Sequence, residues 1–198
     1  MINKQITLEL FCGTKSFSKY HSYINNISLD FDKKFNPDIC IDILEWNYKI
    51  YPPNFFYIIW ASPPCTEYST CLTTRKPKME EADKIILKTL EIIEYFNPKY
   101  YYIENPFTGR LKNRKIMLNL PFKIIDYCSY GYNYRKRTAI WTNNTDWKPK
   151  NLCNKNCKYY DKIVKKHIGH FGTGSTKCKL IDKYSIPKEL IIEIRKFI

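Results

Sequence analysis

The chain has 198 residues, 44% of them hydrophobic and 26% charged, which fits one globular domain and excludes wholesale disorder and collagen-like or mucin-like chains. No apolar run reaches the roughly 18 residues of a membrane helix, and the first residues lack the apolar stretch of a signal peptide. We therefore expect an intracellular protein that is neither secreted nor held in a membrane. Its expected location is the cytoplasm, nucleoid or nucleus of the cell or of an infected host. Lys and Arg number 33 against 19 acidic residues, a formal net charge of +14, which favours nucleic acid as a partner. The chain is also rich in Lys, Asn, Ile and Tyr, and a protein encoded by an AT-rich genome would show the same basic excess.

Seven short apolar runs predict β-strands in the first two-thirds of the chain. They occupy residues 6–11, 27–31, 39–43, 55–61, 100–104, 123–127 and 138–142. Polar or helical stretches separate most of these runs, and that alternation is typical of βαβ units. We therefore expect an α/β fold with a mostly parallel sheet and helices on both faces. In such sheets, ligands bind beyond the carboxyl ends of the strands.

The clearest helix lies between the fourth and fifth predicted strands. Apolar residues recur at helical spacing from Met79 to Phe96. Glu80 and Glu81 lie in the first turn, where the helix dipole favours acids, and Asn97-Pro98 ends the helix.

The alternating pattern breaks after Asn143. Residues 144–180 are rich in Lys, Asn and Cys and predict a small, irregular, basic appendage, and a last helix is predicted after Pro187. The predicted organisation is a catalytic core over residues 1–143, a short recognition region over 144–180, and a C-terminal helix within 181–198 that packs on the core.

Two groups that could do chemistry follow strands of the predicted sheet. Cys65 comes after the strand 55–61 and the rigid pair Pro63-Pro64, which would hold its thiol stiffly at the sheet edge. Glu104 ends the strand 100–104. A thiol and a partly desolvated carboxylic acid in one cleft would form a nucleophile and a proton donor. Taken singly, each also fits a structural interpretation, as a small buried hydrophobe or a solvated strand end.

Other features suit phosphate and nucleotide binding. The run 130–137 interleaves basic and aromatic residues, which is typical of phosphate contacts and base stacking, or of a solvated charge run among packed tyrosines. Near the start, Gly13 follows the first strand in a tight turn. Asp30 ends the second strand, where an acid can bind ribose hydroxyls.

In this order, the motifs resemble those of the cytosine-C5 methyltransferases. That family has a Phe-x-Gly turn, an acidic second strand, an Asp-Ile third strand, a Pro-Cys loop, a Glu-Asn loop and an Arg-rich segment. The matching residues here are Phe11-Cys12-Gly13, Asp30-Phe31, Asp42-Ile43, Pro63-Pro64-Cys65 with Tyr68-Ser69, Glu104-Asn105, and Arg135-Lys136-Arg137. The resemblance covers residues 5–143 and is to compact phage- or virus-type members with a very short recognition region.

The resemblance implies a Rossmann-like fold and methyl transfer from S-adenosylmethionine to C5 of a cytosine flipped out of DNA. Cys65 would attack C6 of the base, and Glu104 would protonate or hydrogen-bond N3. Asn105 would hold the Cys65 loop, and Arg137 would contact the base or its phosphate. The implied cofactor site consists of Phe11, Cys12, Gly13, Thr14, Asp30, Phe31, Asp42, Ile43, Ser62 and Pro63. The expected nucleic-acid contacts are Ser69, Arg135, Lys136, Lys148, Lys155 and Lys165.

The sequence departs from the family pattern at four places, and two alternatives stay open. Lys15-Ser16 replaces the usual Gly-Gly, Thr66 replaces a Gln, Ala139 stands where the family repeats an Arg, and no clear Gly-Asn-Ser motif follows. One alternative is a cytosine-C5 methyltransferase that acts on RNA. The other is a relative that binds nucleic acid with impaired or lost catalysis.

A possible metal site lies in the appendage. Cys153, Cys157, His167 and His170 form the pattern Cys-x3-Cys-x9-His-x2-His, and Cys178 follows. Four such ligands suit a structural zinc ion. The alternative is a set of free thiols and solvent-facing histidines in a DNA-contacting loop. Disulfides are not expected in a chain without an export signal.

Overall fold

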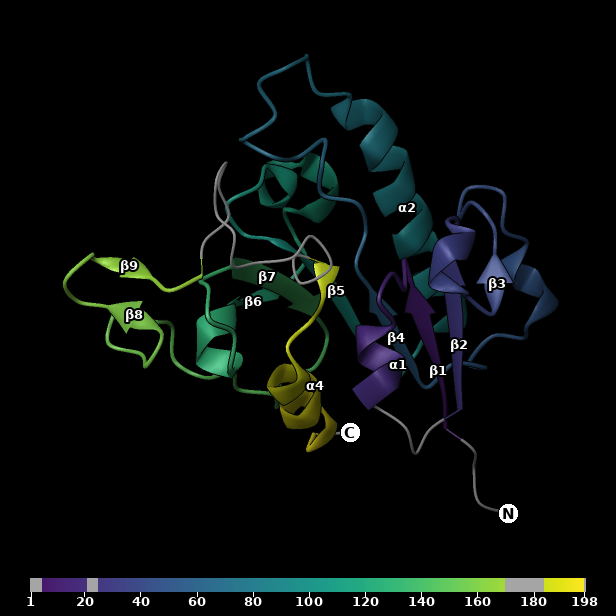
Figure 1. Ribbon diagram of the computed structural model, residues 1–198. Helices are drawn as coiled ribbons and strands as arrows, with labels where there is room; N and C mark the ends of the chain where they lie inside the picture. The colour runs from purple at the N-terminus through teal and green to yellow at the C-terminus, as the bar shows by residue number, and fades with distance from the viewer. Residues whose placement is uncertain (1–4, 21–24, 170–183, 198) are drawn as a thin grey trace.

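The structure, a computed structural model, describes residues 5–20, 25–169 and 184–197 (Figure 1). Its centre is a seven-stranded sheet in the order β3-β2-β1-β4-β5-β7-β6. The strands are β1 (Ile6–Leu10), β2 (Asn25–Asp30), β3 (Ile39–Cys40), β4 (Ile58–Ala61), β5 (Tyr100–Pro106), β6 (Phe122–Asp126) and β7 (Arg137–Thr142). All neighbouring strands from β3 to β5 are parallel, and β7 is antiparallel to both β5 and β6. The predicted mostly parallel sheet is confirmed.

The strand order reverses between β1 and β4. From β1 the chain builds outward through β2 to β3, and it then returns to place β4 and β5 on the other side of β1. Leu10 of β1 is in register with Ala61 of β4. The residues that follow these two strands therefore emerge together at the carboxyl edge, where open α/β sheets bind ligands.

Helices cover both faces of the sheet, as predicted. Side chains of successive strand residues point to opposite faces, so in β4 Ile59 and Ala61 pack in one apolar cluster and Ile58 and Trp60 in the other. The first cluster includes the buried side of α2 (Met79–Phe96), which has the predicted bounds and ends at Asn97 in a left-handed conformation. The second includes α1 (Ser16–Tyr20) and α4 (Lys188–Arg195).

Short 3-10 helices and a small hairpin complete the described fold. The 3-10 helices are η1 (Lys33–Phe35), η2 (Tyr48–Ile50), η3 (Leu111–Asn113), η4 (Lys115–Met117) and η5 (Tyr127–Tyr130). The hairpin consists of β8 (Tyr160–Asp161) and β9 (Lys166–His167), and it stands apart from the sheet in Figure 1. None of the helices in the described ranges is long and apolar enough to cross a membrane.

The chain keeps contact with the core beyond Asn143, where the sequence pattern breaks. Trp147 is fully buried, and its indole N–H donates to Glu193 of α4. The ammonium group of Lys123 in β6 donates to the carbonyl oxygens of Asn144 and Thr145 at 3.0 and 3.2 Å, and to that of Trp147. These bonds fasten the start of the basic segment, and the predicted C-terminal helix, to one face of the sheet.

Candidate active site

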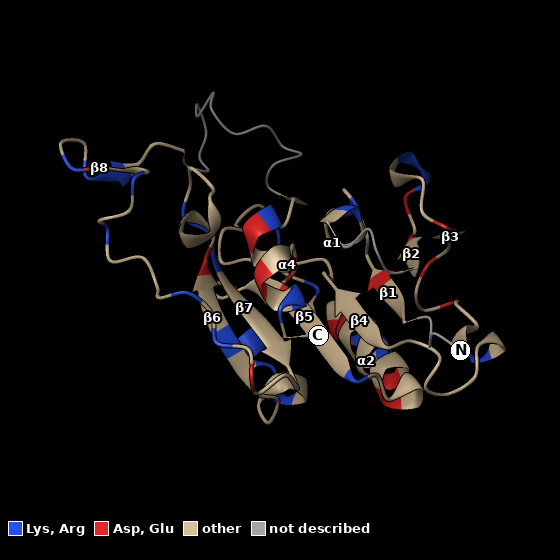
Figure 2. Cartoon of the chain, turned by 90° about the horizontal axis from the view of Figure 1, so that it is seen from below, with Lys and Arg blue, Asp and Glu red and all other residues tan. Residues whose placement is uncertain are grey.

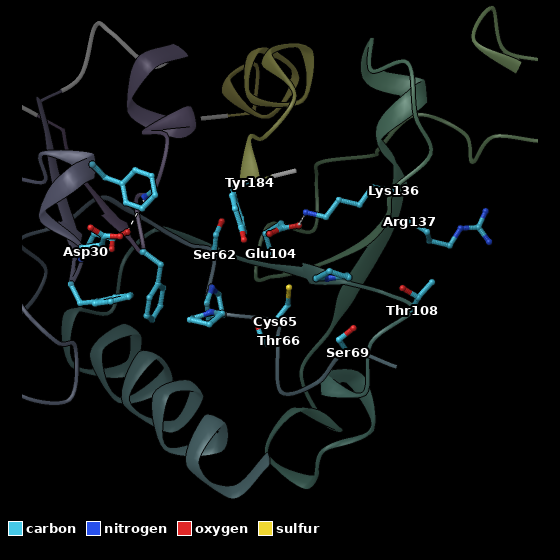
Figure 3. Close-up of a pocket in the computed structure, with 18 of the residues that line it drawn as sticks. Asp30, Ser62, Cys65, Thr66, Ser69, Glu104, Thr108, Lys136, Arg137 and Tyr184 are labelled. Carbon is cyan, nitrogen blue, oxygen red and sulfur yellow. Dashed lines mark hydrogen bonds and ion pairs between the residues drawn. The ribbon is translucent and has the colours of Figure 1, made fainter. Parts of the chain in front are cut away.

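A cavity of about 710 Å³ opens at the carboxyl edge of the sheet, where the strand order reverses (Figure 3). Its size lies in the usual range for small-molecule sites. At one end it is lined by residues at and beyond the ends of β1 and β2. At the other end it is lined by residues that follow β4, that end or follow β5, and that lead into β7. The sequence-predicted residues that line it are Phe11, Gly13, Asp30, Phe31, Ser62, Pro63, Cys65, Ser69, Glu104, Arg135, Lys136 and Arg137.

Cys65 is held by the loop that follows β4. Pro63 and Pro64 restrict the backbone before it, and the amide N–H of Tyr68 donates to the Cys65 carbonyl at 3.1 Å in a tight turn after it. The buried side-chain amide of Asn105 in β5 donates to the Pro63 carbonyl at 3.0 Å. This hydrogen bond joins the Cys65 loop to the strand that carries Glu104.

Glu104 is buried, and two donors hold one of its oxygens. The phenol of Tyr127 donates to Oε1 at 3.0 Å, and the ammonium group of Lys136 donates to the same atom at 3.1 Å. No hydrogen bond reaches Oε2 from the described part of the chain. Burial, followed by the charge of Glu104, holds the pKa of the Tyr127 phenol well above its usual range, so Tyr127 stays a proton-bearing donor.

The electrostatics of the site keep the resting Cys65 protonated. Burial raises the pKa of the thiol, the charge of Glu104 raises it further, and the cation of Lys136 partly opposes both effects. Cys65 is half-buried and lines the cavity, so a ligand can reach its sulfur. The arrangement is a neutral thiol that must lose its proton when it attacks.

The side chains of the basic run 135–137 pair with two different carboxylates. Arg137 and Arg135 both donate to the buried carboxylate of Asp126, at 2.8 and 3.2 Å, whereas Lys136 reaches Glu104. Figure 3 shows Lys136 pointing toward Glu104 and Arg137 pointing away from it. The cation beside the carboxylic acid is therefore Lys136. Arg137, which the resemblance assigns to the base or its phosphate, lines the cavity and pairs with Asp126. Ala139, where the family repeats an Arg, is fully buried in β7 opposite Asn105.

The other end of the cavity is organised by Asp30. One oxygen of its carboxylate accepts from the amide N–H of Gly13 at 2.9 Å, and the other accepts from the N–H of Asp32 at 2.9 Å. Gly13 has a φ of +46°, in the left-handed region that favours glycine. Phe31, the next residue, leaves 71% of its side chain exposed and lines the cavity with an aromatic face.

Some predicted residues lie outside this cavity, and some lining residues were not predicted. Cys12 and Ile43 are buried, Asp42 accepts the amide N–H of Leu44, and Thr14 bonds to Ser16, so these four support the site without lining it. The sequence missed Tyr127, which has no motif of its own. It also missed several lining residues, namely Asp32, Lys34, Phe35, Pro64, Thr66, Pro106, Thr108 and Tyr184. Only Pro64 and Thr66, which flank Cys65, carried a sequence signal.

A second, basic hollow of about 370 Å³ lies between the hairpin and the core. It is lined by Arg135, Lys155, Tyr160, Lys165, Lys166, His167 and Gly169. Figure 2 shows the concentration of basic residues on the hairpin. Arg135, Lys155 and Lys165, which the sequence assigned to nucleic acid, come together here, whereas Lys148 is exposed outside both cavities.

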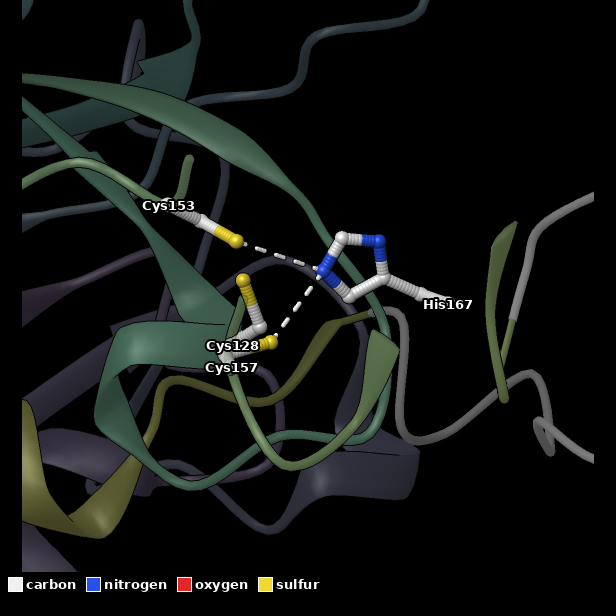
Figure 4. A group of neighbouring side chains, drawn as sticks. All are labelled: Cys128, Cys153, Cys157 and His167. Atoms are coloured by element: carbon white, nitrogen blue, oxygen red, sulfur yellow. Dashed lines mark hydrogen bonds between the residues drawn. The ribbon is translucent and has the colours of Figure 1, made fainter. Parts of the chain in front are cut away.

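Next to this hollow, four side chains form a cluster that could hold a metal ion (Figure 4). They are Cys128, Cys153, Cys157 and His167, whose ligand atoms lie within 4.8 Å of one another. The sequence indicated three of the four. Its fourth candidate, His170, lies outside the described residues, and the structure contributes Cys128 from η5.

The fold is shared with known methyltransferases. A methyltransferase of Entamoeba histolytica, EhMeth, superposes with a TM-score of 0.57 at 18% identity, over 76% of this chain and 56% of that protein. The Dnmt2 methyltransferase of S. pombe gives 0.53 at 16% identity, over 76% and 54%. The chain thus spans about half the length of these structures. Sheet and cavity define a Rossmann-like α/β protein of the methyltransferase fold.

The sequence comparison identifies the family. No protein-family model matches the chain. A probable DNA (cytosine-5)-methyltransferase of frog virus 3 (isolate Goorha) is 30% identical in an alignment of 211 positions that covers 94% of this chain and 97% of that protein. The chain belongs to the DNA (cytosine-5)-methyltransferase family.

Proposed function

We propose that the protein transfers a methyl group from S-adenosylmethionine to C5 of a cytosine flipped out of DNA, with Cys65 as the nucleophile. The observation that carries this proposal is the single cavity that joins Cys65 and Glu104 to the Gly13–Asp30–Phe31 end. A nucleophile and an acid at one end and a nucleoside-binding surface at the other are what a cofactor-dependent transfer to a base requires.

The residues at the Asp30 end fit S-adenosylmethionine. The exposed ring of Phe31 offers a stacking face for the adenine, and the carboxylate at the end of β2 stands where such sheets bind ribose hydroxyls. Gly13 brings its backbone to the cavity without a side chain. When bound, the cofactor supplies an electrophilic methyl group on a sulfonium ion.

The residues at the other end fit the activation of cytosine. Cys65 Sγ forms a bond to C6 and loses its thiol proton to solvent. Glu104 takes up a proton from solvent when the base binds and passes it to N3, which balances the charge on the ring. Oε2 is the oxygen of Glu104 without a partner in the described residues, so it is the one placed to meet N3, while Tyr127 and Lys136 hold Oε1. C5 then carries the electron pair that accepts the methyl group. The C5 proton then passes to solvent, Cys65 leaves as a thiolate as the C5–C6 double bond forms again, and N3 returns its proton to Glu104.

The basic hollow supports DNA as the substrate. Lys155, Lys165 and Arg135 surround it on the same side of the molecule as the start of β7. Lysine and arginine contacts to phosphates position a duplex without specifying its sequence. Extruding the base costs a few kcal/mol, which such contacts offset. An intracellular location, in the cell or an infected host, goes with this substrate.

The test measures methyl transfer from labelled cofactor to mixed DNA and to transfer RNA. Label on DNA with the wild type, and none with Cys65→Ala, is the expected result. Cys71→Ser, which changes an exposed cysteine outside the cavity, is the matched control and should keep full activity. DNA that contains 5-fluorocytosine should trap a covalent complex with the wild type, because fluorine cannot leave C5 as a proton does.

The remaining outcomes would each replace the proposal. Label on RNA alone would make the protein an RNA cytosine-C5 methyltransferase. No label on either, with cofactor and DNA binding still measurable, would make it a binding protein that has lost catalysis. The buried Ala139 and the Lys136–Glu104 pair would then be the positions to examine.

A further inference from the structure

The segment that carries the basic hollow has no hydrophobic core of its own. Among residues 148–168 none is buried, and Ile163 and Val164 leave 93% and 62% of their side chains exposed. The hairpin β8–β9 pairs only two residues on each strand. A two-stranded hairpin of this length is at most marginally stable in water. Small segments that cannot bury a core usually depend on a disulfide or a metal ion.

The four-residue cluster is one of the places where this segment meets the core, besides the hydrogen bonds of Lys150 to Tyr130 and of Ser129 to Asn151. Cys128, 4% exposed, belongs to η5 on the catalytic core, Cys153 and Cys157 lie in the loop before β8, and His167 ends β9. Side chains from three separate parts of the chain thus direct their sulfur or nitrogen atoms toward a common centre (Figure 4). The amide N–H of Cys153 also donates to Asp126 at 3.0 Å, which fixes the loop beside η5.

The distances fit a tetrahedral ion. His167 Nε2 lies 3.5 Å from Cys153 Sγ and 3.4 Å from Cys157 Sγ. With Zn–S of about 2.3 Å and Zn–N of about 2.0 Å, a tetrahedral site has S···N edges of about 3.5 Å and S···S edges of about 3.8 Å. The ring of His167 is also held edge-on by Tyr160, with ring centroids 5.3 Å apart, so its orientation is set by packing.

The donor set selects the ion and its role. Three thiolates and one imidazole, without a carboxylate, favour zinc over the oxygen-seeking ions magnesium and calcium. Four protein ligands fill a tetrahedral shell and leave no open position, which is typical of structural rather than catalytic zinc.

We propose that Cys128, Cys153, Cys157 and His167 bind one structural zinc ion, which fastens the basic hairpin to the catalytic core. His167 faces the cysteines with Nε2 and also lines the basic hollow, next to Lys165 and Lys166. The ion therefore sets where these lysines stand relative to Arg135. The metal site stands on its own geometry, and only its consequence for DNA binding rests on the proposed function.

The first test is the metal content of the full chain after dialysis against metal-free buffer. One zinc per chain is expected for the wild type and for the control Cys71→Ser, and none for Cys157→Ser or His167→Ala. His167→Cys keeps four soft donors and should retain the ion. Because four ligands complete the shell, His170→Ala should also retain it. A wild type without stoichiometric zinc, or a His170→Ala variant that loses it, would overturn the proposed site.

Two further measurements do not depend on whether a variant folds. Wild-type protein loaded with Co²⁺ should show the visible absorption of a tetrahedral ion and thiolate charge-transfer bands, and an octahedral spectrum would contradict the site. Chelation should open the lysine-rich segment 148–168 to trypsin while the core resists, and an unchanged cleavage rate would show that the ion does not hold the hairpin. Stoichiometric zinc in a protein without methyl transfer would leave the site intact and count only against the proposed function.

Discussion

At Cys65, two neighbouring charges act on the thiol in opposite directions. Burial raises its pKa first, the carboxylate of Glu104 adds to that effect, and Lys136 opposes it. A carboxylate beside a nucleophilic thiol hinders ionisation of the sulfur until it takes up a proton or meets the substrate. In the proposed mechanism, the acid that activates the base therefore also lowers the thiolate fraction of Cys65 in the empty site.

Replacing the acid should separate these two roles. In Glu104→Gln the negative charge that raises the Cys65 pKa is gone, so alkylation of Cys65 by iodoacetamide at neutral pH should become faster. Methyl transfer should fall by roughly 10²–10⁴-fold, because the proton for N3 is lost. Alkylation is followed on the Cys65 peptide by mass spectrometry. Glu94→Gln, on an exposed turn of α2, serves as the control for both rates.

The pH dependence of the wild-type thiol follows from the same shift. Because its pKa is raised, the thiolate fraction of Cys65 at neutral pH lies below that of a free cysteine. Its alkylation rate should therefore lag behind that of a free thiol at neutral pH and keep rising at pH values where the free thiol has levelled off. A Cys65 peptide that reacts faster than free cysteine at pH 7 would contradict the assigned electrostatics.

At the scale of elements, the turn between β1 and α1 explains one departure from the family pattern. Lys15 has a φ of 53°, so it keeps the left-handed backbone that a glycine would adopt without cost. The amide N–H groups of Phe17 and Ser18 donate to the buried carboxylate of Glu9 at 2.9 and 3.0 Å, and these bonds hold the start of α1 on the sheet. Lys15 therefore stands, without being a glycine, in a backbone conformation that favours glycine.

Restoring glycine at this turn should stabilise the protein. The left-handed conformation costs a non-glycine residue about 1–2 kcal/mol, and the larger unfolded-state entropy of glycine offsets about 0.5–1 kcal/mol of that. Lys15→Gly should therefore raise the free energy of unfolding by up to about 1 kcal/mol, measured by urea denaturation with an unchanged m-value. Lys19→Gly, inside α1, should lower it by about 0.5–1 kcal/mol. Equal signs for the two variants would contradict the strain at Lys15.

At the scale of the whole molecule, the charge is distributed unevenly. The hollow beside the hairpin gathers Lys155, Lys165, Lys166 and Arg135, whereas the β2 end of the cavity carries the acids Asp30 and Asp32, the second of which pairs with Lys34. We therefore expect a polyanion to be attracted to the hairpin side.

If DNA binds at the basic hollow, the salt dependence of DNA affinity should change when lysines of the hollow are replaced. The double variant Lys155→Ala/Lys165→Ala should bind duplex DNA more weakly, and its slope of log K against log salt should fall by about 0.9 for each phosphate that the protein no longer neutralises. Lys84→Ala, exposed on α2, removes a similar charge elsewhere and should leave the slope unchanged. The measurement is fluorescence anisotropy over a range of salt concentrations. Equal slopes for the wild type, the double variant and Lys84→Ala would show that the hollow is not part of the DNA interface.

Much of this architecture could be predicted from the sequence because its signals are local. The apolar runs indicated the strands, the 3.6-residue period predicted α2 with its bounds, and Pro63-Pro64 marked the loop of Cys65. Prediction was poorer where partners lie far apart in the chain. A motif specifies residue types in order, whereas the buried Asp126 decides that Arg135 and Arg137 pair with it and that Lys136 is the cation beside Glu104.

The sequence by itself determined the strands, the main helices and the order of the motifs that place Cys65 and Glu104 at one edge of a sheet. Periodicity and turn chemistry are properties of neighbouring residues, so they are visible in the chain alone. Only the tertiary structure decided that Lys136 pairs with Glu104, that Tyr184 reaches the cavity from the segment before α4, and that Cys128 joins the cluster of Cys153, Cys157 and His167. These contacts join residues separated by tens of positions, and packing of the whole sheet, which no local pattern records, brings them together.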